Sequence, residues 1–573
     1  MKKTVAFLLA ISCIGLASCG PVGVTTHEKD ESKTYISVRN TNGGVGRAWL
    51  DNAIARYEEA RKDAHFADGK TGVKVEVSDG IMNPASMKQD TYQVYFNGTA
   101  RDIEVLSKED KLYDISSIVT DNTRVGGALS TIITDAAKQK TFFDGKYYAL
   151  PHYNFYYGAS YDAEAFANNN AYFAAEDETE VIEYTGMDIS ITRNFVGSPD
   201  AKKSAGSDGE YGTIDDGLPC SLEEFILLMD YFKNQTEYAP IMVSGTYLNY
   251  INYFLQGLWP ALAGVEQIQN YYNCTGEIEI VDGYTDEPIF PGIDYIKKPK
   301  VKKVTLTEED KNGYLGQQMV AKYYSFAAVE IMEREGYFSA DSYLKSVDHY
   351  GAQKCLIYDG CAEYKKVAML VEASYWYNES KKAGVLSTYE MLTGDTEPRD
   401  VRFMPLPTSY YTPEETTKSP TCYFTALGSY CTVNANIKND EEAIKAVLDF
   451  VAFLYSEEEL KAFTIETGVS RALDYTLSET EINSMPAFYQ QIWRMKSENG
   501  ANIAYGQGNT TTYEKVKNYI PIALSSPRVF EDSYLTMLRQ NNAKTAEGIY
   551  EIGTKKLFDL KQIPQSEWES ILD

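Results

Sequence analysis

The chain has 573 residues, and 54 Lys and Arg against 82 Asp and Glu give it a formal net charge of −28 at pH 7. A chain of this length exceeds what one hydrophobic core usually organises, so we expect two large lobes. The negative charge excludes nucleic acid as a partner, and the isolated lysine run at residues 297–303 is expected to be a solvated loop or hairpin face rather than a phosphate site.

The first residues have the layout of a secretory signal. A basic start precedes an apolar stretch that is too short for a permanent membrane span, and residues 16–19 read Leu-Ala-Ser-Cys. These four residues resemble the lipobox of bacterial lipoproteins, which implies removal of residues 1–18 and a lipid anchor on Cys19. An ordinary secreted protein cleaved near Ser18 is the alternative. Residues 19–33 are polar without periodicity and predict a flexible tether.

Strand and helix signals alternate where the folded body is expected to begin. Residues 34–39 and 72–77 alternate apolar and polar side chains, and apolar residues recur at helical spacing from Leu50 to Tyr57 between them. A strand, helix and strand in this order predict a parallel α/β sheet.

Polar loops follow the first of these strands and another strand expected at residues 92–96. The loop at residues 40–46 contains Asn42 and Gly43, and the later loop leads to Arg101 and Asp102. Ligands bind beyond the carboxyl ends of strands in such sheets, so both loops are candidate binding elements. The glycine spacing matches neither phosphate-binding motif, so phosphate is not the expected ligand.

The aromatic content points to a class of ligand. The chain contains 46 Tyr and 5 Trp, more than packing alone requires. A tyrosine offers a flat face and a polar tip, which suit the C–H faces and hydroxyl rims of sugars. A tyrosine-rich surface also suits protein partners, so composition alone leaves both open.

Cysteine and histidine usage argues against a transition-metal centre. Six cysteines beyond Cys13 and Cys19 permit disulfides without selecting a pairing, and the 4 His have no second His at ligand spacing. No cofactor is therefore required. One acidic, glycine-rich loop could hold a structural calcium ion, with a solvated turn before a helix near Ser221 as the alternative. Its acids are Asp208, Glu210, Asp215 and Asp216.

Four segments, taken in order, resemble one known family. They are the strand, loop, helix and strand of residues 34–77, residues 145–162 with Gly-Lys-Tyr-Tyr-Ala-Leu-Pro, residues 367–379 with Glu-Ala-Ser-Tyr-Trp-Tyr, and residues 403–407 with the helical stretch 441–473. The family comprises the extracellular (family 1) solute-binding proteins of carbohydrate ABC importers, related to maltose-binding protein.

The resemblance implies an α/β, two-lobe periplasmic-binding-protein-like (type II) fold with a hinge between the lobes. The expected parts are an N-lobe of residues 34–155 plus 426–477 and a C-lobe of residues 156–425 plus 478–573. The chain is longer than the family's pattern at residues 171–218 and 274–312, which leaves the exact lobe boundaries open.

The resemblance also implies a ligand site between the lobes. Its expected residues are Asn42, Gly43, Arg101, Asp102, Asn154, Tyr157, Tyr247, Glu372, Tyr375 and Trp376. Of Tyr375, Trp376 and Tyr377, one is expected to meet the sugar, because three consecutive residues cannot all face it. Asn154 and Tyr157 could instead satisfy buried backbone at the hinge. The tyrosines that follow Tyr247 are expected to form a packed stripe with Trp259 and are left out of the site.

The implied function is binding without chemistry. The protein would capture a carbohydrate, an oligosaccharide by its size and aromatics, and deliver it to ABC permease subunits. We expect a monomer outside the cytoplasm, anchored to the cell membrane through Cys19. Two alternatives stay open: a binding protein for a non-sugar ligand such as a peptide, and a surface glycoside hydrolase that uses Glu372 and Asp102 as its carboxylate pair.

Overall fold

The protein is described by a computed structural model over residues 29–506, apart from residues 42, 97–99, 248–249, 308, 311, 396–398, 413–419 and 499–501. The N-lobe is built on a six-stranded sheet with the order β16-β15-β3-β1-β2, in which β6 also pairs with β15. The strands are β1 (Thr34–Asn40), β2 (Val73–Asp79), β3 (Val94–Phe96), β6 (Ala149–Tyr157), β15 (Tyr423–Val433) and β16 (Ile503–Tyr505). Strands β2 and β3 run parallel to β1, whereas β15 runs antiparallel to β3 and β6.

The opening strand and helix form as their periodicity predicts. In β1, Ile36 and Val38 are fully buried while the residues beside them are half-buried, as in a strand with one face on the core. Helix α1 (Ala48–Ala60) buries residues at helical spacing, which are Trp49, Leu50, Ala53, Ile54 and Tyr57. The predicted order of strand, helix and parallel strand is therefore confirmed.

Two later helices complete the N-lobe, and polar caps fix where they begin. Helix α12 (Glu441–Leu454) starts after Asp440, whose side chain accepts a hydrogen bond from the Ala443 N–H. Helix α13 (Glu457–Thr467) ends at Gly468, whose φ of +74° suits glycine. The shorter helices are α2 (Ala100–Lys108), α3 (Ser116–Val119) and α4 (Asp135–Thr141).

The C-lobe is built on a four-stranded sheet with the order β10-β13-β7-β14. Its strands are β7 (Ala159–Asp162), β10 (Ala239–Met242), β13 (Val367–Val371) and β14 (Val401–Phe403). All residues of β13 are buried, as in a strand covered on both faces. The helices are α5 (Ala163–Asn168), α6 (Leu222–Gln235), α7 (Ile251–Asn273), α8 (Val320–Arg334), α9 (His349–Tyr358), α10 (Trp376–Lys382), α11 (Val385–Thr393), α14 (Glu479–Asn483) and α15 (Ala487–Glu498).

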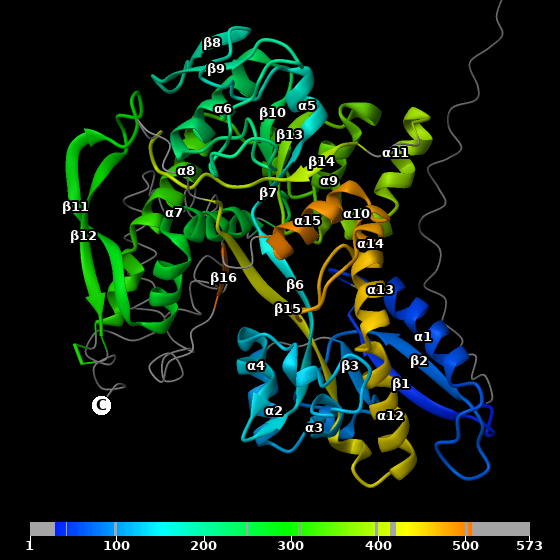
Figure 1. The fold of residues 1–573 in the computed structure, drawn as a ribbon. Helices are drawn as coiled ribbons and strands as arrows, with labels where there is room; N and C mark the ends of the chain where they lie inside the picture. Colours follow the sequence, from blue (N-terminus) through cyan, green and yellow to red (C-terminus); the bar gives the residue numbers. More distant parts are fainter. Residues whose placement is uncertain are drawn as a thin grey trace, which may run out of the picture.

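Two-stranded hairpins stand beside these sheets. They are β4 (Phe142–Phe143) with β5 (Lys146–Tyr147), β8 (Val181–Thr185) with β9 (Thr192–Val196), and β11 (Gly276–Pro288) with β12 (Lys297–Leu306). The last two pairs lie where the chain is longer than the family's pattern, and β11 with β12 forms a long ribbon at the edge of the molecule (Figure 1). The lysine run at residues 297–303 lies on β12, so it is a hairpin face as expected.

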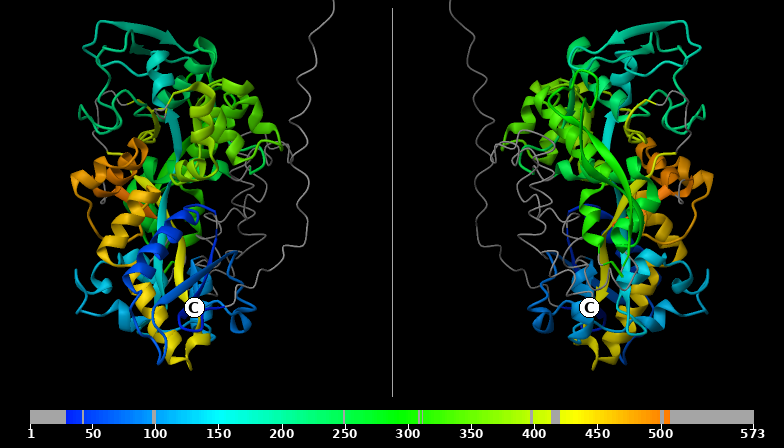
Figure 2. Two further views of the ribbon diagram at one scale, coloured as in Figure 1. Left: turned by 90° about the vertical axis from the view of Figure 1, so that its right-hand side faces the viewer. Right: turned by 90° about the vertical axis from the view of Figure 1, so that its left-hand side faces the viewer.

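Two adjacent strands connect the lobes. Strand β6 belongs to the sheet of the N-lobe and continues through Gly158 into β7 of the C-lobe, while β15 lies antiparallel beside β6. Figure 1 shows both strands between the lobes, and Figure 2 shows the C-lobe above the N-lobe from two further sides. A Cβ added at Gly158 would lie 2.8 Å from Cζ of Phe403, so the crossing requires a residue without a side chain. The predicted two-lobe α/β fold class is confirmed.

The exact boundaries of the two lobes stay a prediction, but the pairing of one strand bears on them. Strand β16 pairs with β15 in the sheet of the N-lobe, although residues 478–573 were expected in the C-lobe.

The six cysteines within the described residues are free thiols. Among the helices of that same part of the chain, none combines the length and apolarity that a membrane span needs.

Candidate ligand-binding site at the lobe junction

The loop that follows β1 contacts the C-lobe directly. The Gly44 N–H donates a hydrogen bond to Oε1 of Glu379 at 2.9 Å, and Nδ2 of Asn378 donates to the Val45 carbonyl at 2.9 Å. Gly44 has a φ of +61°, and a Cβ there would collide with the hydroxyl of Tyr153 on β6. The predicted loop at residues 40–46 therefore does lie at the junction between the lobes, with Gly43 next to these contacts.

Four predicted functional residues cannot be tested on their side chains. Asn42 and the lipid-anchor residue Cys19 lie outside the described residues. Arg101 and Asp102 lie in the first turn of α2, but their side chains are outside the described part of the chain. Their roles stay predictions.

Asn154 and Tyr157 lie on the crossing strand β6. The Asn154 N–H donates to the Ser470 carbonyl at 3.0 Å, and the Ser470 hydroxyl donates to Oδ1 of Asn154 at 2.6 Å. The Asn154 side chain thus bonds to a side chain and not to backbone, and its role stays a prediction. Tyr157 stacks instead on Tyr253, with ring centroids 5.0 Å apart, and burial raises its pKa to about 12.

Tyrosines from the start of α7 extend this stack. The ring centroid of Tyr250 lies 5.1 Å from that of Tyr253 and 5.6 Å from that of Tyr247. Tyr247 is 43% exposed. Trp259, further along α7, is buried in the C-lobe core as expected. Tyr250 and Tyr253 are partly buried against the C-lobe core, as expected for a packed stripe, and they also lie beside the junction.

The three consecutive aromatic residues after β13 have different surroundings. The Tyr375 hydroxyl lies 2.9 Å from that of Tyr253, and its ring meets Phe155 edge-on at 5.0 Å. Trp376 is fully buried, and its Nε1 donates to the Ser160 hydroxyl at 2.8 Å. Tyr377 stacks on Phe488. The inclusion of Trp376 among the ligand contacts is corrected: only Tyr375 of the three faces the junction.

Two carboxylates complete the site. Glu372 follows β13, is 1% exposed, and neither of its oxygens has a hydrogen-bond partner within the described residues. Glu379 on α10 has Oε2 without a partner there. Burial, and then the charge of Glu379, raise the pKa of Glu372 well above its usual range. Burial raises the pKa of Glu379 to about 7, although the Gly44 N–H, Lys382 and Gln353 lower it.

We call these residues the junction cluster: Tyr157, Tyr247, Tyr250, Tyr253, Tyr350, Tyr375, Glu372 and Glu379. Tyr350 on α9 belongs to it because Glu379 and Glu372 add to the effect of burial in raising its pKa. The sequence identified Tyr157, Tyr247, Glu372 and Tyr375 but missed the other members. Their only signal was the helical spacing of the tyrosines and the position of Glu379 within the family-like segment at residues 367–379.

The acidic loop before α6 uses its carboxylates internally. Oδ2 of Asp215 accepts from the Asp208 N–H, Oδ1 of Asp208 accepts from the Glu210 N–H, and Oδ2 of Asp216 accepts from the Gly212 N–H. Within the described ranges no group of three or more His, Cys, Asp or Glu side chains is placed to hold a metal ion. Calcium binding by Asp208, Glu210, Asp215 and Asp216 therefore stays a prediction without structural support.

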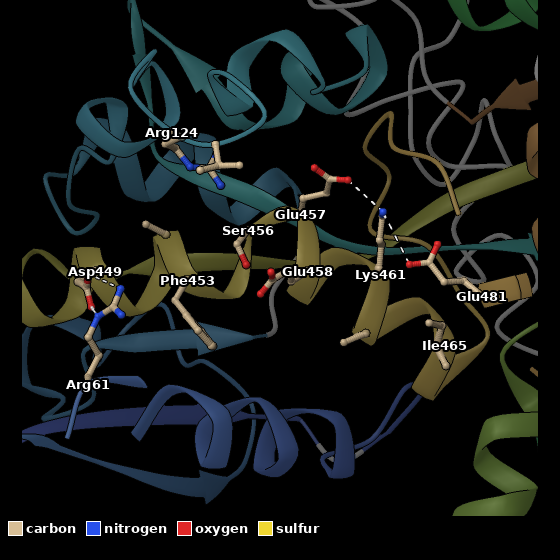
Figure 3. A pocket seen from close by; sticks show the side chains of 13 residues that line it. Arg61, Arg124, Asp449, Phe453, Ser456, Glu457, Glu458, Lys461, Ile465 and Glu481 are labelled. Atoms are coloured by element: carbon tan, nitrogen blue, oxygen red, sulfur yellow. Dashed lines mark hydrogen bonds and ion pairs between the residues drawn. The ribbon is translucent and has the colours of Figure 1, made fainter. Parts of the chain in front are cut away.

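A separate groove of about 810 Å³ lies on the N-lobe where α12 meets α13 (Figure 3). Most of its charged side chains pair with one another. Lys461 lies 3.0 Å from Glu457 and 3.7 Å from Glu481, and Arg61 lies 2.8 Å from Asp449. The groove thus lacks the unpaired buried carboxylate that distinguishes the junction cluster.

Comparisons with known proteins agree on the fold. No protein-family model matches the chain, and no curated protein does. A chitin oligosaccharide binding protein matches with a TM-score of 0.52 and 15% identity, covering 91% of this chain and 98% of its own. RafE, solved in complex with raffinose, matches with a TM-score of 0.53 and 11% identity, covering 94% and 100%.

A third similar structure comes from Bifidobacterium animalis subsp. lactis. It is the binding protein BlMnBP1 of an ABC transporter, solved in complex with mannobiose, with a TM-score of 0.50, 12% identity, and coverage of 94% of this chain and 95% of its own. At such low identity these structures establish the fold alone. The chain has the type II periplasmic-binding-protein-like fold of these solute-binding proteins.

Proposed function

We propose that the protein is the substrate-binding lipoprotein of an ABC importer, which captures a carbohydrate between its lobes and delivers it to a membrane permease. The observation that carries this proposal is the junction cluster. It brings tyrosine ring faces, hydroxyls and carboxylates together where the lobes meet. Ring faces suit the C–H faces of a sugar, and the polar groups suit its hydroxyls.

The two-lobe fold supplies the working cycle. A ligand that touches both lobes stabilises the closed form over the open form, because only the closed form offers both sets of contacts. Tyr375 and Glu379 belong to the C-lobe, and the Gly44 loop, which already bonds to Glu379, belongs to the N-lobe. A bound sugar would add contacts to this interface, and the closed form would dock on the permease.

The similar structures support a carbohydrate ligand. They are a chitin oligosaccharide binding protein and two proteins solved with raffinose and mannobiose, and each of these ligands has more than one sugar unit. We infer an oligosaccharide ligand, a monomeric protein without a required cofactor, and attachment to the outer side of the cell membrane through acylated Cys19. Two or more acyl chains give durable attachment, whereas one chain binds reversibly.

We also infer that the bound sugar leaves unchanged. A glycoside hydrolase needs two carboxylates on either side of the scissile bond, one of them ionised. In the junction cluster the pKa of Glu372 is raised well above its usual range and that of Glu379 to about 7, so neither carboxyl group is fully ionised near neutral pH. A binding role needs only their hydrogen bonds.

The experiment is a thermal-shift screen of the mature protein, lacking Cys19, against mono- and oligosaccharides, with chromatography of the recovered sugar. Selective binding to the folded state must raise the apparent midpoint. A shift with one sugar family and recovery of intact sugar would support the proposal. Cleaved sugar would restore the hydrolase alternative, and a shift with peptides alone would replace the carbohydrate by a non-sugar ligand.

A further inference from the structure

Glu372 is a buried carboxylate whose hydrogen bonds are incomplete. Its side chain is 1% exposed, and neither oxygen makes a hydrogen bond of standard geometry within the described residues, although the Gln353 side chain and the Ala373 N–H lie close enough to lower its pKa. Burying a carboxylate in this way is costly unless it is neutral or a ligand compensates it. The Glu372 side chain can therefore still accept hydrogen bonds from a ligand.

Four tyrosine hydroxyls lie within electrostatic range of this carboxylate. Burial is the main cause of the raised pKa values of Tyr250, Tyr253, Tyr350 and Tyr375, and the charge of Glu372 adds to it for each of them, so all four lie near Glu372. The face of a tyrosine ring carries negative potential and attracts cations. Ring faces and a carboxylate together form the environment in which proteins bind ammonium groups.

Within the described residues, no positive side chain contributes to the pKa of Glu372. Over the described residues, neither Glu372 nor Glu379 forms an ion pair with a lysine or arginine. Lys382 lowers the pKa of Glu379, but no cation affects that of Glu372. Burial lowers the pKa of nearby His349, which keeps its ring neutral. A positive group from the ligand would supply what the protein lacks.

We propose that the ligand is an amino sugar, and that Glu372 binds its protonated amino group among the tyrosine rings. This inference rests on the proposed carbohydrate-binding function and names the class of sugar. On binding, the ammonium group donates hydrogen bonds to the carboxylate of Glu372, and the proton that the carboxyl group held in the free protein passes to the solvent. A neutral sugar would bind the protonated carboxyl group and release no proton.

The test compares three β-1,4-linked oligosaccharides that differ only at C2 of each unit. Oligomers of glucosamine carry an ammonium group there, those of N-acetylglucosamine a neutral amide, and those of glucose a hydroxyl. Titration calorimetry at about pH 5.5, where the amino groups of the free ligand are protonated, in two buffers with different ionisation enthalpies, measures affinity and proton release together. We expect the glucosamine oligomer to bind at least tenfold more tightly than the other two and to release close to one proton.

Two variants separate this role from a structural one. Glu372→Gln should bind the three oligomers with similar affinities and release no proton. Glu330→Gln is the matched control, because Glu330 is also fully buried in the C-lobe and has a raised pKa of about 8, but it pairs with Arg334 at 2.8 Å. This control should keep the tenfold preference. If Glu372→Gln fails to fold, the number of protons that the unchanged protein releases on binding still tests the inference.

Three results would overturn the inference. They are equal or tighter binding of the N-acetylated or glucose oligomers, binding of the glucosamine oligomer without proton release, and binding of none of the three. Each leaves the proposed function standing as long as the wider screen finds another sugar that binds and is recovered intact. The proposed function fails only when that screen finds no sugar.

Discussion

At the scale of single residues, Tyr375 and Trp376 show how neighbours in sequence acquire different roles. Tyr375 reaches the hydroxyl of Tyr253 at the junction, whereas Trp376 bonds to Ser160 inside the C-lobe. Successive side chains at the start of a helix point about 100° apart, so packing of α10 against the lobe decides which one faces the ligand.

Substitution should separate these two roles. Tyr375→Ala should weaken ligand binding by a factor of about ten to a hundred, because it removes a ring at the junction, and it should also lower stability because that ring is buried against Phe155. Trp376→Ala should lower the free energy of unfolding by about 3–5 kcal/mol, because it opens a cavity in the core. Calorimetry and urea unfolding check both. A Trp376→Ala protein with unchanged stability would contradict its placement.

Glu379 should make stability depend on pH. Its pKa is raised to about 7 in the folded protein from the usual 4.5, so between these values the folded state binds more protons than the unfolded state. The free energy of unfolding should therefore fall as the pH rises from 5 to 8, by an amount on the order of 3 kcal/mol from this group. Urea unfolding across this range measures it. Glu379→Gln should show a clearly smaller fall, and equal curves would refute the assignment.

The candidate site could be predicted only in part. Glu372 and Tyr375 followed from a segment similar to a known family, and Gly43 from a polar loop at a strand end. Tyr250 and Glu379 could not be chosen, because their roles depend on how the two lobes meet. Sequence periodicity describes one helix face and contains no information about the opposite lobe.

At the scale of elements, the loop after β1 depends on one glycine rather than its neighbour. Gly44 has a φ of +61° and lies against Tyr153, whereas Gly43 has no atom within 4 Å of an added Cβ and no positive φ. This loop connects the first strand of the N-lobe to α10 of the C-lobe through the Gly44 to Glu379 hydrogen bond. The contact of this loop with the C-lobe therefore depends more on its backbone conformation than on its side chains.

Gly44→Ala should disturb this contact, and Gly43→Ala should not. An alanine at a positive φ costs about 1 kcal/mol or more, and here its Cβ would also displace Tyr153. We expect Gly44→Ala to weaken ligand binding at least fivefold, with Gly43→Ala within a factor of two of the original protein. Calorimetry with the ligand found in the screen checks this. Equal affinities would show that the loop does not shape the site.

Elements with clear periodicity were predictable, and short ones were not. Strand β1 and helix α1 follow directly from alternation and from helical spacing. Strand β16 has three residues, too few for any period, and it joins the N-lobe sheet only because β15 leaves an edge there. This strand forms through tertiary pairing, so no local sequence pattern predicts it.

At the scale of the whole molecule, two lobes joined by β6 and β15 should move against each other. A sugar held between the lobes should lower the radius of gyration of the protein, because it favours the closed form. Small-angle X-ray scattering with and without the sugar measures the change. The control is a sugar that gives no thermal shift. An unchanged radius with saturating ligand would mean that the described form is already closed.

The proposed attachment of the protein to the membrane depends on Cys19. Cys19→Ala should move the protein from the membrane fraction to the medium, because no acyl chain can then be attached. Cell fractionation followed by immunoblotting checks this. The mature protein should bind sugar with the same affinity in both cases. A Cys19→Ala protein that stays with the membrane would contradict the lipid anchor.

The composition of the junction cluster has an optical consequence. Its aromatic members are all tyrosines, whereas the four tryptophans of the described chain, Trp49, Trp259, Trp376 and Trp493, are at most 4% exposed within the cores. Tryptophan fluorescence should therefore follow unfolding, and the near-ultraviolet circular dichroism of stacked tyrosines should follow ligand binding. One sample thus offers two independent spectroscopic signals, one for the integrity of the lobes and one for occupancy of the site.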